Sequence, residues 1–253
     1  MLRYYKFRDE LFAPVPAKDV YTKRPTGHGW PEQCPPVRAA NAFGFDLLAN
    51  YDVTFHRTED GWEFEDQVTL ASDFAWSGDE ESEGRPLVQD YAWFWTKGQQ
   101  LPHPITDDVW PSVRDQVKLS TFLFLETAPN ETLLFCDVPW RGKPLADRAW
   151  RTIPALVEPD WYPTAHPWHV VLELDRRHEA ITIAKGTPLA RLMPLRRDTY
   201  FAAPMTVDDF DRHFSRSQRW LSTHGKPTDN GHVLDTQKTY VKQQAKSRFI
   251  VRE

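Results

Sequence analysis

The chain has 253 residues, of which 40% are hydrophobic and 13% aromatic, and this composition is sufficient for a real core and argues against wholesale disorder. A net charge of −5 gives no electrostatic reason to expect nucleic acid or an anionic membrane as a partner. No apolar run approaches the roughly 20 residues that a membrane-spanning helix needs. Because the N-terminal residues also lack the pattern of a signal peptide and no CxxC pair occurs, we expect a cytoplasmic protein with reduced cysteines.

The N-terminal part of the chain is punctuated by turn-forming residues. Prolines and glycines are dense over residues 14–36, which predicts extended chain rather than regular elements. Alternating apolar residues over 51–55 predict a strand, and Asp60-Gly61 predicts a hairpin turn before a second strand at 62–64. The acidic, glycine-bounded segment 77–84 is expected to be a solvated loop.

The middle of the chain contains long apolar runs. Residues 91–95 are continuously aromatic, as in a strand that is buried on both faces. Residues 116–126 and 132–138 are joined by a short polar turn, which predicts a central hairpin. Residues 139–160 are rich in proline and glycine and predict a long connection that includes a short strand at 151–157.

The clearest alternation lies in the segment that follows. Residues 169–174 alternate between apolar and more polar side chains, which predicts a strand buried on one face, and apolar positions recur over 181–183. The segment 185–188 predicts a tight turn between two antiparallel strands, in which Gly186 takes a positive φ. A third strand is expected over 189–193, closed by the proline that follows.

After Tyr200 the apolar period changes from 2 to 3.6, as in an amphipathic helix. Thr206 and Asp209 resemble a capping box, and Gly225 is placed to end the helix. Its apolar stripe consists of Val207, Phe210, Phe214 and Leu221. A weaker helix is predicted near 233–247. Together with the strands predicted before Tyr200, this pattern indicates a mostly β protein with a helical C-terminal part.

The predicted architecture has a β-rich part followed by a helical part. The β-rich part, a jelly-roll or β-sandwich-like single domain with a proline-rich N-terminal lead, is expected over residues 1–200. The helical extension is expected over residues 201–253 and should pack on the β domain or on a partner. Because its apolar stripe is large, a homo-oligomer formed through this tail is a further expectation.

Three segments in a fixed order resemble an uncharacterised family of bacterial and phage proteins, known as a domain of unknown function. They are CPPVRAANAFGFDLL at 34–48, AWRTIPALVEPDWYP at 149–163 and ITIAKGTPLARLMPLRRDTY at 181–200. The resemblance covers roughly residues 30–200 and leaves the helical tail outside. It implies a shared β-rich fold and brings no known activity or catalytic residue.

A second resemblance is to the last strands of trimeric dUTPases. The residues that fit that family's pattern are Ile183, Gly186, Leu189, Ala190 and Leu192. The family's glycine-rich phosphate-binding tail and its Asp-bearing catalytic loop are missing from this sequence. The resemblance therefore implies jelly-roll-like architecture and not nucleotide hydrolysis.

A histidine-rich segment suggests a metal site. His166, His169 and Glu173 form an H-x-x-H-x3-E pattern, and imidazole and carboxylate groups suit a single divalent metal ion. In a regular strand His169 and Glu173 share a face, whereas His166 joins them only if Pro167 bends the chain. His103 or Asp160 would supply a further ligand. The alternative, which is favoured, is an exposed strand face that carries a His–Glu pair beside a loop histidine.

Aromatic and basic residues suggest a ligand site without a metal. Three tryptophans beside prolines fit equally the wall of a pocket or the core: Trp140, Trp161 and Trp168. Three arginines fit equally an anionic ligand or an exposed strand end paired with Asp198 and the acidic loop: Arg191, Arg196 and Arg197. Cys34 is expected to be a free thiol without a catalytic partner.

The sequence leaves functions of different classes open, because it contains no GxSxG, P-loop, GxGxxG or HExxH motif. The first is an enzyme of bacterial type that acts on a small polar molecule or a peptide in specialised metabolism. His166, His169 and Glu173 would then be its metal-binding or acid–base groups. The second is a non-catalytic module that binds a small ligand through the aromatic pocket or assembles through the helical tail.

Overall fold

The computed structural model describes residues 1–6, 9–18, 34–64, 103–104, 113–139, 148–162, 167–227, 234–236, 239–240 and 242–243. The predicted loop at 77–84 and the predicted strand at 91–95 lie outside these residues. The chain divides into a first unit, Met1–Val20 with Ala40–Asp198, and a second unit, Tyr21–Ala39 with Thr199–Glu253. As predicted, it is mostly β and carries a helix near its C-terminus.

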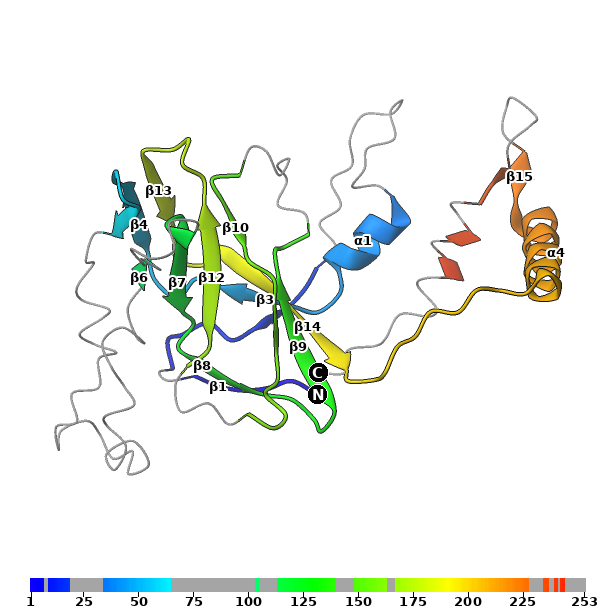
Figure 1. Cartoon of the computed structure of the whole chain (residues 1–253), viewed down its shortest axis with the longest axis horizontal. Helices are drawn as coiled ribbons and strands as arrows, with labels where there is room; N and C mark the ends of the chain where they lie inside the picture. The colour runs from blue at the N-terminus through cyan, green and yellow to red at the C-terminus, as the bar shows by residue number, and fades with distance from the viewer. Residues whose placement is uncertain are drawn as a thin grey trace. The chain divides into compact units, whose positions relative to one another are not determined.

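The first unit is built from antiparallel sheets (Figure 1). One sheet has the order β11 (Ala155–Val157), β9 (Glu131–Cys136), β14 (Pro188–Arg196), β3 (Phe45–Leu48) and β2 (Val15–Pro16). Another has the order β10 (Trp150–Thr152), β12 (His169–Leu174), β7 (Gln116–Ser120) and β6 (His103–Pro104). Smaller sheets contain β13 (Ala180–Ile183), β4 (Val53–Arg57) and β5 (Trp62–Phe64), and β1 (Arg3–Lys6) with β8 (Leu123–Glu126).

These sheets share a hydrophobic core. The alternation predicted for β12 is confirmed, because Val170, Leu172 and Leu174 are buried while the residues between them are partly exposed. Buried side chains from the other sheets join the same cluster, for example Phe55 of β4 and Leu192 of β14. Sheets that face a common core make the first unit sandwich-like.

Two long strands bend from one sheet into another at the Gly186 turn. β3 pairs with β14 in one sheet, and their continuations β4 and β13 pair in another. The bend is fixed because the Ala49 amide donates to the Thr187 carbonyl and the Gly186 amide donates to the Ala49 carbonyl, each at 2.8 Å. Gly186 has the predicted positive φ, 85°. The two strands that this turn joins, β13 and β14, do not pair with each other, because β13 pairs with β4 and β14 pairs with β3 and β9.

The predicted central hairpin over 116–126 and 132–138 is also wrong. A break at Thr121-Phe122, where Phe122 has a φ of 55°, separates β7 from β8. β7 then pairs with β12, β8 with β1, and β9 with β11 and β14. The alternation of apolar residues had identified the strands but not their partners, because a one-sided pattern fits any neighbour in a sheet.

Prolines explain further differences from the predicted elements. Helix α1 (Pro35–Asn41) begins inside the segment predicted to be extended, because proline is accepted in the first turn of a helix. β14 continues through Pro194, which pairs with Leu133 on one side. Proline has no backbone N–H to donate to a neighbouring strand. Since the pairing with β3 ends at Leu192, no strand needs that hydrogen bond on the β3 side of Pro194. The strand predicted at 151–157 is divided at Ile153-Pro154 into β10 and β11.

The second unit contains α4 (Val207–His224) and a short strand pair, β15 (Lys226–Pro227) with β16 (Leu234–Asp235). The predicted capping box is confirmed, because the Thr206 hydroxyl accepts from the Asp209 amide at 3.2 Å. Gly225 caps the helix as expected, but in an extended conformation with a φ of −73°. β16 replaces the start of the weaker helix predicted at 233–247. Within the described residues, no helix has the length and apolarity of a membrane span.

Gly44 and Gly186 provide a matched test of the turns, because their φ angles are 86° and 85°. A Cβ at Gly44 would lie 2.2 Å from the Leu192 carbonyl oxygen, whereas a Cβ at Gly186 would lie 3.9 Å from the Phe12 ring. We expect Gly186→Ala to lower the free energy of unfolding by about 1 kcal/mol through backbone strain alone. Gly44→Ala should cost about 1–3 kcal/mol more, because it adds a steric clash. Urea unfolding measures both, and equal losses would contradict this account.

Candidate functional site

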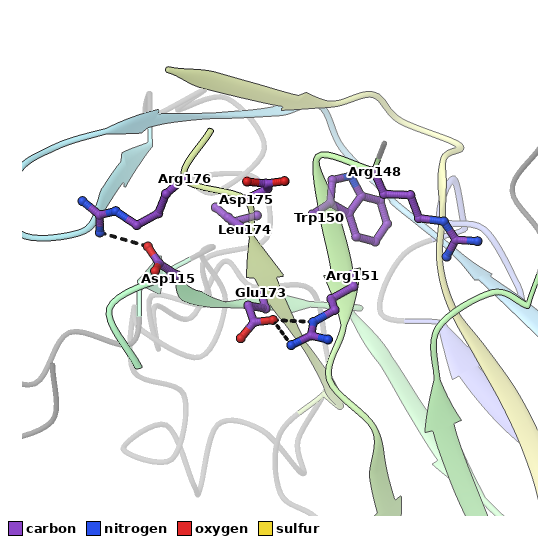
Figure 2. A pocket seen from close by; sticks show the side chains of 8 residues that line it. All are labelled: Asp115, Arg148, Trp150, Arg151, Glu173, Leu174, Asp175 and Arg176. Carbon is purple, nitrogen blue, oxygen red and sulfur yellow. Dashed lines mark hydrogen bonds and ion pairs between the residues drawn. The ribbon is translucent and has the colours of Figure 1, made fainter. Parts of the chain in front are cut away.

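A cleft of about 410 Å³ lies where β10 begins and β12 ends (Figure 2). Its lining residues are Asp115, Arg148, Trp150, Arg151, Glu173, Leu174, Asp175 and Arg176. Backbone bonds close this edge of the sheet, since the Leu174 amide donates to the Asp115 carbonyl and the Asp175 amide to the Ala149 carbonyl, each at 2.8 Å. The volume falls within the range of about 300–1,000 Å³ that is usual for small-molecule sites.

An ion pair across the two strands stands at the centre of the cleft. The register places Arg151 of β10 directly opposite Glu173 of β12. Both Nε and Nη2 of Arg151 contact the same carboxylate oxygen, Oε2 of Glu173 (Figure 2). The second oxygen, Oε1, takes no part in this contact. The side chains of Arg151 and Glu173 remain 55% and 32% exposed, so a ligand can reach this pair.

The wall formed by Asp115 and Arg176 is held rigidly. Arg176 Nη1 donates to Asp115 Oδ1 at 3.0 Å, and the buried indole of Trp62 donates to the same oxygen at 3.2 Å. Arg176 Nη2 donates in addition to the carbonyls of Thr58 and Glu59 in the turn between β4 and β5. These hydrogen bonds fix the positions of the two side chains from within the protein.

Asp175 carries a fixed negative charge beside the cleft. Its carboxylate accepts hydrogen bonds from Arg177 Nε at 2.8 and 3.0 Å and from the Arg177 amide at 2.9 Å. These hydrogen bonds, chiefly those from the Arg177 side chain, lower the pKa of Asp175 to about 2. Asp175 is therefore ionised across the physiological range.

Arg148, Trp150 and Leu174 form the more buried parts of the lining. The side chain of Arg148 is only 9% exposed and pairs with Asp137. Figure 2 shows its guanidinium directed away from the Arg151–Glu173 pair. Trp150 and Leu174 are 9% and 3% exposed and contribute apolar surface. The guanidinium groups that a ligand can reach are therefore those of Arg151 and Arg176.

The lining is balanced in charge, with three arginines and three carboxylates among its described residues. Such a site complements a molecule that carries both a positive and a negative group. The described lining contains no cysteine, histidine, serine or lysine that could act as a nucleophile. The chemistry that these residues support directly is binding by charge-assisted hydrogen bonds, with Glu173 as the residue able to exchange a proton with a ligand.

The predicted metal site is brought together only in part. His169 and Glu173 share the outward face of β12, but they are four positions apart along the strand, which separates their Cα atoms by about 13 Å. Glu173 is paired with Arg151, and His166 lies outside the described residues. Over the described ranges, no three His, Cys, Asp or Glu side chains cluster as metal ligands would. A metal at these residues stays a prediction.

The further ligands suggested for that metal lie elsewhere. Asp160 is held by Arg197, whose two terminal nitrogens donate to it at 2.7 and 3.0 Å. These hydrogen bonds lower the pKa of Asp160. His103 lies in β6 opposite Lys118 of β7, and Lys118 in turn lies opposite Val171 of β12. His103 is thus separated from the β12 residues by a whole strand.

Two of the three tryptophans considered for an aromatic site belong to a row of rings. Trp161, which is 60% exposed, contacts Tyr162 with ring centroids 6.0 Å apart. Tyr162 contacts Trp168 at 6.3 Å, and Trp168 contacts the buried Phe135 at 6.4 Å. Trp161 and Trp168 are therefore connected through Tyr162, which the sequence had not singled out. Trp140 lies outside the described residues.

The predicted group of arginines is divided by the structure. Arg191 is 2% exposed, and its Nε donates to Asp46 at 2.7 Å. Its Nη1 donates to the carbonyls of Ala40 and Phe43 at 2.8 and 2.9 Å. The interpretation of Arg191 as a ligand-binding residue is corrected, because its side chain is buried and committed to the fold. Two other pairs remain on the surface: Arg196 with Asp198 at 3.5 Å, and Arg197 with Asp160.

Most residues of the cleft had no signal in the sequence. Arg151 and Glu173 are 22 residues apart, and only the strand register shows that they pair. Asp115 and Arg176 are 61 residues apart and meet because the strands that they flank are neighbours. The polar run at 175–179 was visible only as a break between the apolar positions of 169–174 and those of 181–183.

No protein-family model and no curated protein sequence matches the chain. Among solved structures, it is similar to a dUTPase of phage phi11 of S. aureus, with 9% identity, a TM-score of 0.37, and 83% of this chain and 99% of that chain covered. The EIAV dUTPase is 11% identical with a TM-score of 0.34, and the match covers 82% of this chain and 98% of that chain. A dUTPase of Staphylococcus bacteriophage 80alpha is 8% identical with a TM-score of 0.35, and the match covers 83% of this chain and 98% of that chain. TM-scores below 0.5 assign neither an activity nor site residues to this chain.

The Asp175–Arg177 interaction should make stability depend on pH in a defined way. Because the folded-state pKa of about 2 lies below the usual value, this contribution is present above pH 4 and is lost as the pH falls through about 2. Asp175→Asn should lower the free energy of unfolding by on the order of 1 kcal/mol at pH 7. Urea unfolding at pH 7 and pH 2 checks this, and a difference from the wild type that persists unchanged at pH 2 would contradict it.

Proposed function

We propose that this protein binds a small zwitterionic molecule, such as an amino acid or a short peptide, in the cleft at the ends of β10 and β12. The observation that carries the proposal is the charge-balanced lining around the accessible Arg151–Glu173 pair. A ligand with one kind of charge would meet as much repulsion as attraction there, whereas a zwitterion can place each group beside its opposite.

The unused atoms of the central pair suggest how the ligand would lie. Arg151 contacts Glu173 through Nε and Nη2, which leaves its Nη1 to donate to a ligand carboxylate. Glu173 contacts Arg151 through Oε2, which leaves Oε1 to accept from a ligand ammonium group. Apolar parts of the ligand would meet Trp150 and Leu174.

An enzyme that acts on a small polar molecule or peptide is the second candidate. It is favoured by Glu173, since its Oε1 is not used by Arg151 and could take a proton from a bound ligand. A divalent metal ion at His166, His169 and Glu173 belongs to this candidate. Metal analysis of protein purified without a tag separates the two, because stoichiometric metal supports the enzyme and its absence favours the binding module.

Binding should depend on Arg151 and not on cross-strand ion pairs in general. Arg151→Gln is expected to weaken the best ligand at least about tenfold, which corresponds to the loss of one charge-assisted hydrogen bond. Arg3→Gln is the matched control, because Arg3 of β1 also lies directly opposite a glutamate, Glu126 of β8. Affinities are measured by calorimetry, after a thermal-shift screen of the amino acids and of dipeptides.

Blocked ligands test the zwitterion itself. Acetylation of the ligand's amine or amidation of its carboxylate should each reduce affinity. Raising the salt concentration should also weaken binding, because salt screens the attraction between charged groups. The proposal fails if no amino acid or dipeptide binds at millimolar concentration. It fails equally if Arg3→Gln weakens binding as much as Arg151→Gln does.

A further inference from the structure

Helix α4 presents an apolar stripe to solvent. Val207, Phe210 and Phe214 are 77%, 52% and 51% exposed. The rings of Phe210 and Phe214 stack on one another, with centroids 5.9 Å apart and an interplanar angle of 24°. All residues of α4 are described, and none of them is buried. A helix of 18 residues gains little stability from propensity alone, so an apolar face of this size calls for a partner.

The spacing of the stripe fits helix pairing. Positions 207, 210, 214, 217 and 221 alternate steps of three and four residues, which is the repeat that places one seam of a helix against another helix. Phenylalanine or an aliphatic residue occupies these positions except at 217, where Ser217 leaves room for a larger ring from the other side. The seam is therefore continuous over most of the helix.

Charge is distributed unequally along α4, and this distribution selects the partner. The first turn carries two acidic residues, Asp208 and Asp209, with Asp211 directly after it, and no basic ones. The rest carries basic residues and no acidic ones: Arg212, Arg216 and Arg219. An identical helix that runs in the opposite direction would place its basic part beside this acidic turn, whereas a parallel copy would set like charges together. The balanced charge of α4 favours neither nucleic acid nor a lipid surface.

We propose that α4 associates with α4 of a second copy of this chain, antiparallel and centred on Phe214. In that arrangement Phe214 meets its own counterpart on the two-fold axis, and Val207 meets Leu221 of the second copy. Phe210 then lies against the small side chain at position 217. The arrangement is isologous, so the pair closes and does not extend into a filament.

Sedimentation equilibrium of the full-length chain tests the association. The wild type should be dimeric, and Phe214→Glu, which places two carboxylates on the axis, should raise the dimer dissociation constant at least about tenfold. Ser215→Glu is the matched control, because it adds the same charge one residue outside the stripe, and it should leave the dissociation constant unchanged. Circular dichroism confirms that both variants keep the helix.

Disulfide trapping tests the direction of the helices. In a chain whose own cysteines are replaced by serine, a mixture of Val207→Cys and Leu221→Cys variants should form the mixed disulfide. Val207→Cys alone should form none, and a disulfide between two copies at position 207 would overturn the antiparallel arrangement. A wild type that stays monomeric at about 100 µM would overturn the association itself. A monomeric wild type whose melting temperature falls in Phe214→Glu would show that the stripe is covered within one chain.

Discussion

The side chain of Asn50 joins three segments that are far apart in the sequence. Its Oδ1 accepts from the Phe12 amide at 2.7 Å, and its Nδ2 donates to the Thr121 carbonyl at 2.8 Å. Asn50 itself lies in the bend between β3 and β4 and is 2% exposed. If this side chain were removed, the buried Thr121 carbonyl would lose this partner at a cost of about 1–3 kcal/mol, and the partly buried Phe12 amide would lose its acceptor. Asn50 thus ties the bend between β3 and β4 to the chain at Phe12 and to the break at Thr121.

The same bends place the cleft. The break at Thr121-Phe122 lets β7 pair with β12, because the Thr121 amide and hydroxyl both donate to the Trp168 carbonyl just before β12 begins. Once β7 and β12 are in register, Asp115 before β7 lies beside the residues that follow β12. The charged residues of the cleft are therefore positioned by strand ends and not by a long loop, and the core fixes those strands.

Local features of this chain were predictable from sequence, and long-range ones were not. The burial of Val170, Leu172 and Leu174 and the positive φ of Gly186 follow from alternation and turn chemistry, which act within a few residues. The roles of Arg191 and Arg151 depend on strand pairing, which no local pattern encodes. An arginine at a strand position looks the same in sequence whether it is buried against Asp46 or exposed beside Glu173.

A crystal structure with the tightest-binding amino acid or dipeptide shows whether the cleft at the start of β10 and the end of β12 is the ligand site. We expect electron density in the cleft, with the ligand carboxylate within hydrogen-bonding distance of Arg151 and its ammonium group at Glu173. Density on the aromatic row of Trp161 and Tyr162, with the cleft left empty, would contradict it.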